Sequence, residues 1–338
     1  MDKNPQIHLI ARPQGVATVD LFKAVTAEQV PLQEGEVRVR NHFLSVDPYM
    51  RMRLEDAKSY AAPQALGEVM AGGTAGEVVE SRHPRFAVGD AVTGMGGWQL
   101  FSVFSAAAIA GLRKIDVTRT PLSSSLGAFG MPGVTAWYGL LKIIEPKAGE
   151  TVLVSAASGA VGSVVGQLAK RRGARAVGIA GGPEKCAHVV NELGFDACVD
   201  HKAHADTASL TAALRAACPQ GIDGNFENVG GIVLDAAMAC MNTFGRIAVC
   251  GSISGYDSEA IPMAEPRRIL TQRLKLEGFI ISDQLQIWPE ALAELGELVA
   301  SGKLVRHETI AQGLDAAPAA LLGLLTGRNL GKQLVKLI

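Results

Sequence analysis

Cysteine is scarce in this sequence, and none lies in the first half of the chain. The five thiols, among 338 residues, are Cys186, Cys198, Cys218, Cys240 and Cys250. They form no CxxC pair and no cluster with metal-ligand spacing, and their number is odd. Such a scattered set is more typical of the reduced thiols of the cytoplasm than of a disulfide framework. We therefore expect a cytoplasmic protein.

An excess of charge and long hydrophobic runs are also missing. The formal net charge is −1, from 32 basic and 33 acidic residues spread along the chain, so no basic stripe is available for nucleic acid. Apolar runs are interrupted well before a bilayer could be crossed. The amino end, "MDKNPQIHLIARP", has no basic segment followed by an apolar one, which argues against a signal peptide. Neither nucleic acid nor a membrane is an expected partner.

Two patterns divide the chain, and its length already favours two domains. The first third has short strands in which valine alternates with polar residues between Gly and Pro turns, as in "EVRVRNHFLSVDP". From about residue 126, wholly apolar strands alternate with helices. This alternation predicts an α/β domain with a parallel sheet covered by helices on both faces. The tail should add a short helix and a strand.

The stretch "TVLVSAASGAVGSVVGQLAK", residues 151–170, reads as a buried strand, a tight turn and a helix. Gly159 and Gly162 occupy the second and third positions of a dinucleotide fingerprint, around Ala160 and Val161, while Ala156 replaces the first glycine. Small residues let a pyrophosphate approach the unpaired N–H groups at the start of the helix. The surrounding strand–helix repeat makes this motif specific.

The end of the following strand indicates which dinucleotide binds. An NAD site has an acid there for the ribose 2′-OH, but this chain has Gly181 and Gly182, followed by Lys185, with His201 after the next strand. Two glycines leave room for a phosphate, and Lys185 supplies charge for it. We therefore expect NADPH rather than NADH. Without the glycines, Lys185 would read as an ordinary solvated helix lysine.

Taken together and in order, the segments "LSVDPYMR", "GMPGVTAW", "AASGAVGSVVGQLAK", "GGPEKCAH", "ENVGG", "CGSISGY" and "GRNLGK" resemble a known family. The chain is similar over its whole length to zinc-independent medium-chain dehydrogenases/reductases. Within these it resembles the NADPH-dependent alkenal/one oxidoreductases, which include prostaglandin reductases and bacterial curcumin reductases. The resemblance implies a Rossmann domain, a doubly wound parallel sheet, over residues 126–299. A β-rich, GroES-like catalytic domain would comprise residues 1–125 and 300–338.

The resemblance also assigns residues to the coenzyme. Gly159 to Gly162 would hold the pyrophosphate and Lys185 the 2′-phosphate, where His201 replaces a tyrosine of many relatives. Residues assigned to the nicotinamide half, with one from the tail, are Asn228, Cys250, Gly251, Ser252, Ile253, Ser254, Gly255, Tyr256, Phe279, Ile280, Ile281 and Asn329.

A metal site is not expected. Zinc-dependent relatives need Cys and His ligands, but no cysteine precedes Cys186, and Glu68 stands where their zinc motif has histidine. Reduction of an enone needs less help than reduction of a carbonyl, because the substrate's own oxygen takes up charge as an enolate that a hydrogen bond can stabilise. The expected reaction is NADPH-dependent reduction of the carbon–carbon double bond of α,β-unsaturated ketones or aldehydes, with hydride going to the β-carbon.

Tyrosines are few, so the candidates for the polar catalytic group are few. Tyr256 ends the loop "CGSISGY" at the ligand-binding edge of the predicted sheet, and Tyr49 lies in "VDPYM". Both match tyrosines that line the family's active site. We expect Tyr256 to be the principal group, then Tyr49, with water as an alternative proton donor.

Two alternative functions are consistent with the same glycine motif: an NADPH quinone reductase, and a protein that binds NADPH without catalysis.

The apolar strand "LKLEGFIIS" is expected near a sheet edge, where a second copy of the chain could pair with it. A homodimer is therefore expected. The physiological enone is not specified by these residues.

Overall fold

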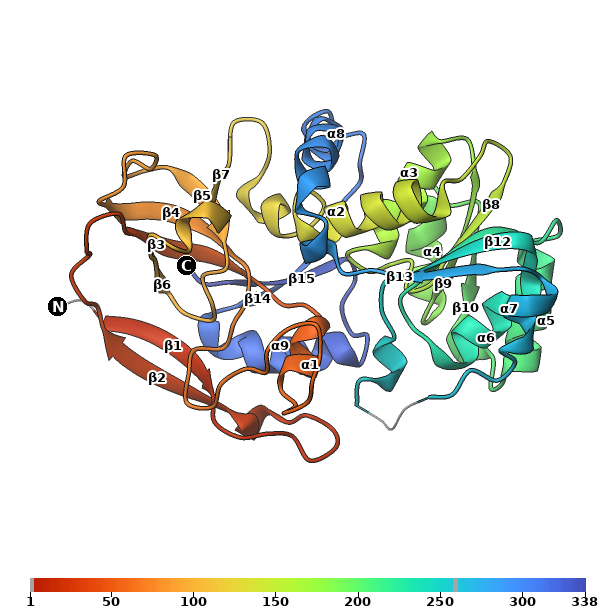
Figure 1. The fold of residues 1–338 in the computed structure, drawn as a ribbon, viewed down its shortest axis with the longest axis horizontal. Coiled ribbons are helices and arrows are strands. Elements are labelled where there is room, and N and C mark those ends of the chain that lie inside the picture. Colours follow the sequence, from red (N-terminus) through yellow and green to blue (C-terminus); the bar gives the residue numbers. More distant parts are fainter. Residues whose placement is uncertain (1–2, 258–260) are drawn as a thin grey trace. The chain divides into compact units, whose positions relative to one another are not determined.

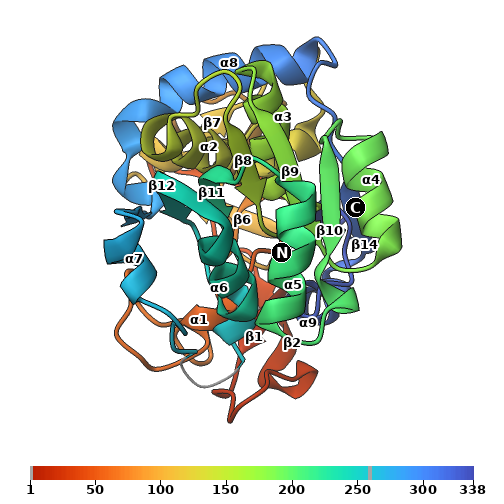
Figure 2. The same ribbon diagram turned by 90° about the vertical axis from the view of Figure 1, so that its right-hand side faces the viewer.

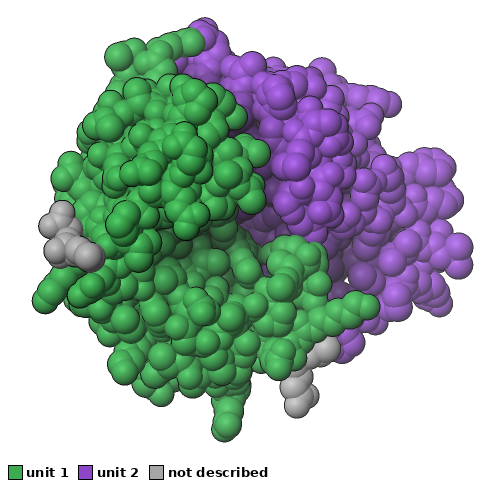
Figure 3. Space-filling view, turned by 60° about the vertical axis from the view of Figure 1, so that its left-hand side comes forward, with its two compact units in different colours: residues 1–127, 308–338 green, residues 128–307 purple. Residues whose placement is uncertain are grey.

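The chain forms two compact units in the computed structural model, which describes residues 3–257 and 261–338. One unit comprises residues 1–127 and 308–338, and the other residues 128–307 (Figures 1 and 3). No helix in the described residues is both long and apolar enough to cross a membrane.

The first unit is built on β-strands. Strand β1 (Lys3–Leu9) pairs with β2 (Phe22–Glu28) as an antiparallel ribbon. A seven-stranded sheet has the order β14-β15-β3-β4-β5-β7, with β6 also paired to β3. Its strands are β3 (Val37–Ser45), β4 (Thr74–Ser81), β5 (Ala91–Gly94), β6 (Phe101–Phe104), β7 (Arg113–Lys114), β14 (Glu308–Gln312) and β15 (Lys332–Lys336).

Residues 308–338 of the tail belong to this first unit. Strand β15 runs antiparallel to β3, with Leu334 opposite Ser45. The helices α1 (Tyr49–Arg53) and α9 (Ala317–Leu325) contribute Met50 and Leu321 to a shared core, in which Trp98 stacks on Phe22. Burial of these large side chains joins both ends of the chain in one domain.

The second unit is a doubly wound α/β domain. Its six-stranded parallel sheet has the order β10-β9-β8-β11-β12-β13, the arrangement of dinucleotide-binding sheets. The strands are β8 (Thr151–Val154), β9 (Arg175–Ala180), β10 (Ala197–Asp200), β11 (Ile222–Glu227), β12 (Met241–Val249) and β13 (Lys275–Gly278). The helices are α2 (Met131–Tyr138), continued by a π-helical segment over Gly139–Ile144, α3 (Gly162–Arg171), α4 (Pro183–Asn191), α5 (Thr207–Ala217), α6 (Gly231–Cys240), α7 (Arg267–Thr271) and α8 (Trp288–Ala300). The predicted fold class is confirmed.

Helices cover both faces of this sheet (Figure 2), which explains why its central strand β8 is an apolar run. Val152 and Val154 of β8 pack into a core with α2, α3 and α8, whereas Leu153 between them packs into a second core with α5 and α6. Successive side chains of a strand point to opposite faces, so a strand buried on both sides is mostly apolar. A polar residue is buried there only with hydrogen-bond partners, as Glu227 of β11 is.

Candidate active site

The predicted coenzyme residues of the second unit lie where its parallel strands end. The turn after β8 and the turn after β11 are neighbours, because these two strands pair directly. From β8 the strand order continues toward one edge of the sheet, and from β11 it continues toward the other edge. Ligands of open α/β sheets bind in the crevice at this switch point.

The glycine turn is closed by its own backbone. Gly159 N–H donates to the carbonyl of Ala156 (2.9 Å), and Ser163 N–H donates to that of Gly159 (3.0 Å) as α3 begins. A Cβ at Gly162 would lie 2.4 Å from the oxygen of Ala156, so a side chain is excluded there. Ala156 itself has a φ of 49°, a conformation that glycine adopts at less cost. The residue at the first fingerprint position is thus an alanine in a backbone conformation that is typical of glycine.

Ser155 and Glu227 join the two turns. The Glu227 carboxylate is completely buried and accepts hydrogen bonds from Ser155 Oγ (3.0 Å) and from the backbone N–H groups of Val229 (2.6 Å) and Gly230 (2.8 Å). Asn228, beside it, donates to the Ser155 carbonyl through Nδ2 (2.8 Å) and to Ser155 Oγ through its backbone N–H (2.7 Å). Burial raises the pKa of Glu227, against the effect of these donors. The network fixes Asn228 at the switch point.

The loop after β12 is anchored on the same turn. Cys250 N–H donates to the Glu227 carbonyl (2.8 Å), and Ile253 N–H donates to the Asn228 carbonyl (3.1 Å). A Cβ built on Gly251 would lie 3.3 Å from the Tyr256 hydroxyl. Tyr256 therefore folds back so that its hydroxyl lies over the start of its own loop, beside the turn that carries Asn228.

An aromatic cluster follows β13. The Phe279 ring lies 5.4 Å from that of Tyr138 and 6.2 Å from that of Phe226, measured between centroids. Ile281 is buried next to it, and Ile280 is half-buried between the two. The predicted nicotinamide residues of this segment thus form an apolar wall at the carboxyl end of the edge strand.

Basic side chains gather where β9 and β10 end. A Cβ on Gly181 would lie 2.9 Å from His201 Nε2 and 3.0 Å from Lys202 Cε. Burial and the nearby Lys202 lower the pKa of Lys185. Burial also lowers the pKa of His201, an effect that Asp200 opposes and that Lys202 and Lys185 strengthen. The absence of a side chain at Gly181 therefore lets the side chains of His201 and Lys202 lie against the end of β9.

In the first unit, Tyr49 begins α1 two residues after Asp47. Burial, together with the Asp47 charge, raises the pKa of the Tyr49 phenol far above its usual range. Asn329 is buried, and its Nδ2 donates to the carbonyl of Gly331 (2.8 Å) shortly before β15. Within this unit, Tyr49 and Asn329 lie on the two segments that a buried Lys332–Asp47 pair joins.

The structure brings most of the predicted coenzyme residues together along one edge of the parallel sheet. Sequence reasoning missed Ser155, Glu227 and Lys202, although all three adjoin predicted residues. Lys202 directly follows His201, and Glu227 opens the "ENVGG" segment. A serine or acid next to a turn gives no sign that its side chain turns inward, so their roles emerge only from the hydrogen bonds.

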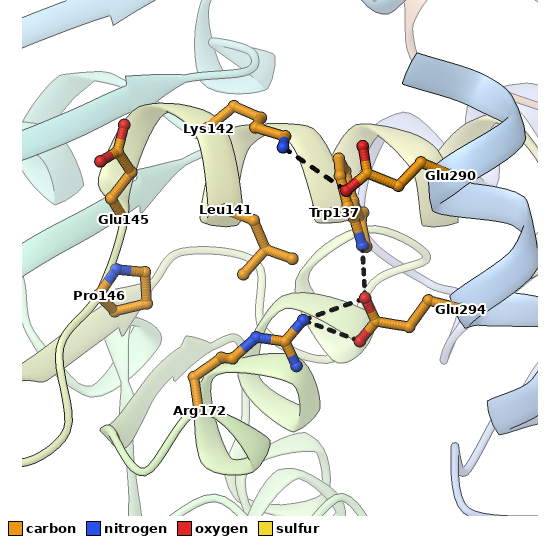
Figure 4. A pocket seen from close by; sticks show the side chains of 8 residues that line it. All are labelled: Trp137, Leu141, Lys142, Glu145, Pro146, Arg172, Glu290 and Glu294. Atoms are coloured by element: carbon orange, nitrogen blue, oxygen red, sulfur yellow. Dashed lines mark hydrogen bonds and ion pairs between the residues drawn. The ribbon is translucent and has the colours of Figure 1, made fainter.

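A separate hollow of about 540 Å³ lies in the second unit near the carboxyl end of α3 (Figure 4). Four of its charged side chains form two pairs, Lys142 with Glu290 and Arg172 with Glu294. Glu294 accepts from Trp137 Nε1 (2.8 Å) and from Arg172 Nη2 (2.9 Å), while Lys142 lies over the Trp137 ring and 3.7 Å from Glu290. Arg172 follows the last residue of α3, whereas the glycine turn precedes the first, so this hollow is not the coenzyme site.

Metal-ligating side chains do not gather at any point within residues 3–257 and 261–338: no three His, Cys, Asp or Glu residues are grouped so that they could hold an ion.

The chain matches two family models: one described as the N-terminal domain of oxidoreductase, over residues 5–112, and one described as zinc-binding dehydrogenase, over residues 160–297. It is 43% identical to the NADPH-dependent curcumin reductase of Escherichia coli (strain K12), over 99% of this chain and 97% of the relative. It is also 43% identical to the NADP⁺-dependent 2-alkenal reductase of Nicotiana tabacum, over 93% and 91%. The crystal structure of CurA from Vibrio vulnificus in complex with NADPH superimposes with a TM-score of 0.91, at 43% identity and 99% coverage of each chain.

Proposed function

The chain belongs to the zinc-independent medium-chain dehydrogenases/reductases, in the NADPH-dependent alkenal/one oxidoreductase family, and on this premise we propose that it reduces the carbon–carbon double bond of α,β-unsaturated ketones and aldehydes. The observation that carries this proposal is the switch point, where a glycine turn, a fixed Asn228 and a tyrosine-bearing loop share one network. That arrangement suits a dinucleotide whose reactive ring lies next to a hydrogen-bonding hydroxyl.

The residues fit NADPH. Gly159 carries no side chain that would hinder a pyrophosphate at the helix start. Gly162 keeps the turn tight, since a Cβ there would strike the backbone of Ala156. Lys185 and His201 suit the 2′-phosphate. The nicotinamide half would be held by Asn228, the residues from Cys250 to Tyr256 and the wall formed by Phe279, Ile280 and Ile281. Asn329 is assigned to the coenzyme from the tail.

NADPH, when bound, supplies the hydride for the β-carbon of the enone. Tyr256 would donate a hydrogen bond to the substrate oxygen as charge develops on it, which stabilises the enolate. Tyr49, protonated because burial keeps its pKa high, is the second candidate for this role and for delivering the proton to the α-carbon. Neither step requires a metal ligand from the protein.

The two units would divide these tasks. We propose that the first unit binds the substrate and the second unit binds NADP. The domain bounds expected from the sequence, 1–125 with 300–338 and 126–299, differ from those of the units by two residues at one boundary and by eight at the other. Strand β13, the edge of the parallel sheet, presents unpaired backbone groups that suit a second copy of the chain, so a homodimer is proposed. The reduced state proposed for the thiols suits the cytoplasm.

Purified protein, NADPH and a panel of enones, alkenals and quinones test the function through loss of nicotinamide absorbance. We expect oxidation with the enones and alkenals, and products in which the double bond, not the carbonyl, is reduced. Activity confined to quinones would replace this function with a quinone reductase. Tight NADPH binding without turnover on any compound would indicate a binding protein.

A further inference from the structure

Both ring nitrogens of His8, in the first unit, face hydrogen-bond acceptors. His8 lies in β1, where its Nδ1 is 2.7 Å from the carbonyl oxygen of Gly67 and its Nε2 is 2.8 Å from Oε1 of Gln6. A backbone carbonyl can only accept a hydrogen bond, and a neutral imidazole has one N–H donor and one acceptor nitrogen. A neutral ring can therefore make both bonds only if the Gln6 amide turns round.

Neighbouring backbone groups hold the Gln6 amide in its orientation. Gln6 Nε2 donates to Oε1 of Gln99 (2.8 Å), and Gln99 Nε2 donates to the carbonyl of Gly96 (2.8 Å). Asn4 Nδ2 donates to the same Gln99 oxygen (3.1 Å). The Asn4 amide is itself fixed, because its oxygen accepts from the Phe101 N–H and its nitrogen donates to the Phe101 carbonyl, both at 2.9 Å. A turned Gln6 amide would place its oxygen against that of Gln99, so all these bonds are made only when the imidazole carries two protons.

The Gly67 carbonyl belongs to the segment between α1 and β4. Backbone hydrogen bonds also tie this segment to β1: Gly67 N–H donates to the Leu9 carbonyl (2.7 Å), and Met70 N–H donates to that of Ile7 (2.9 Å). The imidazole adds to this contact a bond from a charged donor, which is stronger than a neutral one.

The same segment lies close to Tyr49. Besides burial and the Asp47 charge, the Tyr60 phenol raises the pKa of Tyr49. At the end of α1, the carbonyl of Arg53 accepts a hydrogen bond from the N–H of Gln64 (2.8 Å). Release of the segment from β1 would therefore loosen the surroundings of α1.

We propose that the doubly protonated ring of His8 is a pH-sensitive latch, which holds residues 54–69 against β1. The latch does not depend on the proposed function. An imidazole ordinarily loses its second proton near about pH 6.5, and below that pH both bonds of the ring are made. Above it, whichever nitrogen keeps the proton, a lone pair of the other faces an oxygen, and one bond is lost. The segment is thus held most firmly in mild acid and loosens as the pH rises.

The charged side chains next to the ring come from two neighbouring segments. Lys23 stands directly opposite His8 on β2, on the same face of the ribbon, and disfavours a second proton on the ring. Glu68, in the latched segment, favours that proton. Residues 5–11 carry no other charged side chain, and residues 96–101 carry none. The two nearby charges oppose each other, so the hydrogen-bond acceptors decide the effect of protonation.

Hydrogen exchange followed by mass spectrometry tests the latch in the whole chain without coenzyme. The amides of residues 62–71 are compared between about pH 5.5 and about pH 8.5, after correction for the intrinsic exchange rate at each pH. In the unaltered protein we expect their protection to fall about tenfold over this range, as one bond from a charged donor is lost. Protection that does not change with pH would overturn the inference.

The decisive variant is Gln6→Met, which removes the acceptor at Nε2 and leaves the ring in place. A neutral ring with its proton on Nδ1 then satisfies Gly67, so the pH dependence should disappear. Gln14→Met, which replaces an exposed glutamine of the same unit, is the matched control and should keep the pH dependence. A tenfold fall that survives Gln6→Met would refute the latch.

Two further variants separate the ring from its surroundings. His8→Phe removes both donors, so protection should be low at every pH. Lys23→Met removes the opposing charge, so the fall in protection should move to higher pH. If His8→Phe is protected as well as the unaltered protein in mild acid, the backbone bonds alone hold the segment and the inference fails.

Discussion

The ammonium group of Lys332 lies 3.0 Å from the carboxylate of Asp47, and both side chains are almost completely buried. Lys332 Nζ also donates to the carbonyls of Val46 (2.7 Å) and Gln333 (3.0 Å), so its three donors are all used. The pair connects the start of the tail strand to the loop that leads into Tyr49. Residues that are 285 positions apart in sequence therefore fix one corner of the first unit.

Lys332→Met should destabilise the first unit by about 3–5 kcal/mol, because Asp47 is left buried without its cation. Lys336→Met is the matched control, since Lys336 lies on the same strand but is exposed, and it should change stability by less than about 0.5 kcal/mol. Denaturant unfolding followed by circular dichroism measures both. Equal stability of the two variants would show that the buried pair contributes nothing.

The glycine turn permits a paired test of backbone geometry. Gly162→Ala should weaken NADPH binding at least about tenfold, since its Cβ would lie 2.4 Å from a backbone oxygen, and the turn would have to open. Ala156→Gly should leave binding intact and change stability by at most about 1 kcal/mol, because relief of the left-handed strain offsets the greater freedom of glycine in the unfolded chain. Fluorescence titration with NADPH, alongside thermal unfolding, measures these effects. Strong binding by Gly162→Ala would remove the turn from the coenzyme site.

The sequence specified the parallel sheet well because its signals are local. Apolar strands such as "TVLV" followed by glycine turns leave few alternatives, and the order of the strands then follows from the dinucleotide-binding pattern. No local sequence pattern indicates that the tail belongs to the first unit, because the pairing of Leu334 with Ser45 is a contact between segments that are far apart in the sequence. Only the family resemblance suggested it.

The sequence does not show which polar side chains point into the interior of the protein. Glu227 reads as a surface acid, yet its carboxylate is fully buried among backbone donors. Nothing in the sequence marks Lys202, whose side chain lies against Gly181 at the end of the neighbouring strand. Patterns of residue type predict helices, strands and turns. They do not predict which neighbouring strand end a side chain contacts.

The thiols should resist the electrophilic substrates proposed for this enzyme. Burial raises the pKa of Cys250 and of Cys218 to about 12, and it raises the pKa of Cys186, Cys198 and Cys240 as well. An unfolded thiol titrates near about 8.5, and the thiolate is the reactive form. At neutral pH, Cys218 and Cys250 of the native protein should therefore react with an alkenal at least about 100-fold more slowly than in the denatured chain.

Mass spectrometry after timed exposure to an alkenal, without NADPH, measures this difference. Denatured protein provides the control for intrinsic reactivity at the same pH. Rapid modification of Cys250 in the native protein would mean that its surroundings do not hold it as a neutral thiol.

Tyr256→Phe separates the chemical step from coenzyme binding. The hydroxyl lies beside Gly251 in a loop whose backbone is held by Glu227 and Asn228, so its removal should leave the loop and NADPH affinity unchanged. Loss of one hydrogen bond to a developing oxyanion lowers kcat by about 100-fold or more, and we expect an effect of at least about tenfold. Steady-state kinetics with a saturating enone give kcat, and a titration with NADPH gives the coenzyme affinity.

The comparison variant is Tyr49→Phe. The Tyr49 phenol stays protonated across the accessible pH range because burial raises its pKa. If kcat is unchanged in Tyr256→Phe but falls in Tyr49→Phe, the catalytic hydroxyl belongs to Tyr49, and if neither falls, the proton comes from water.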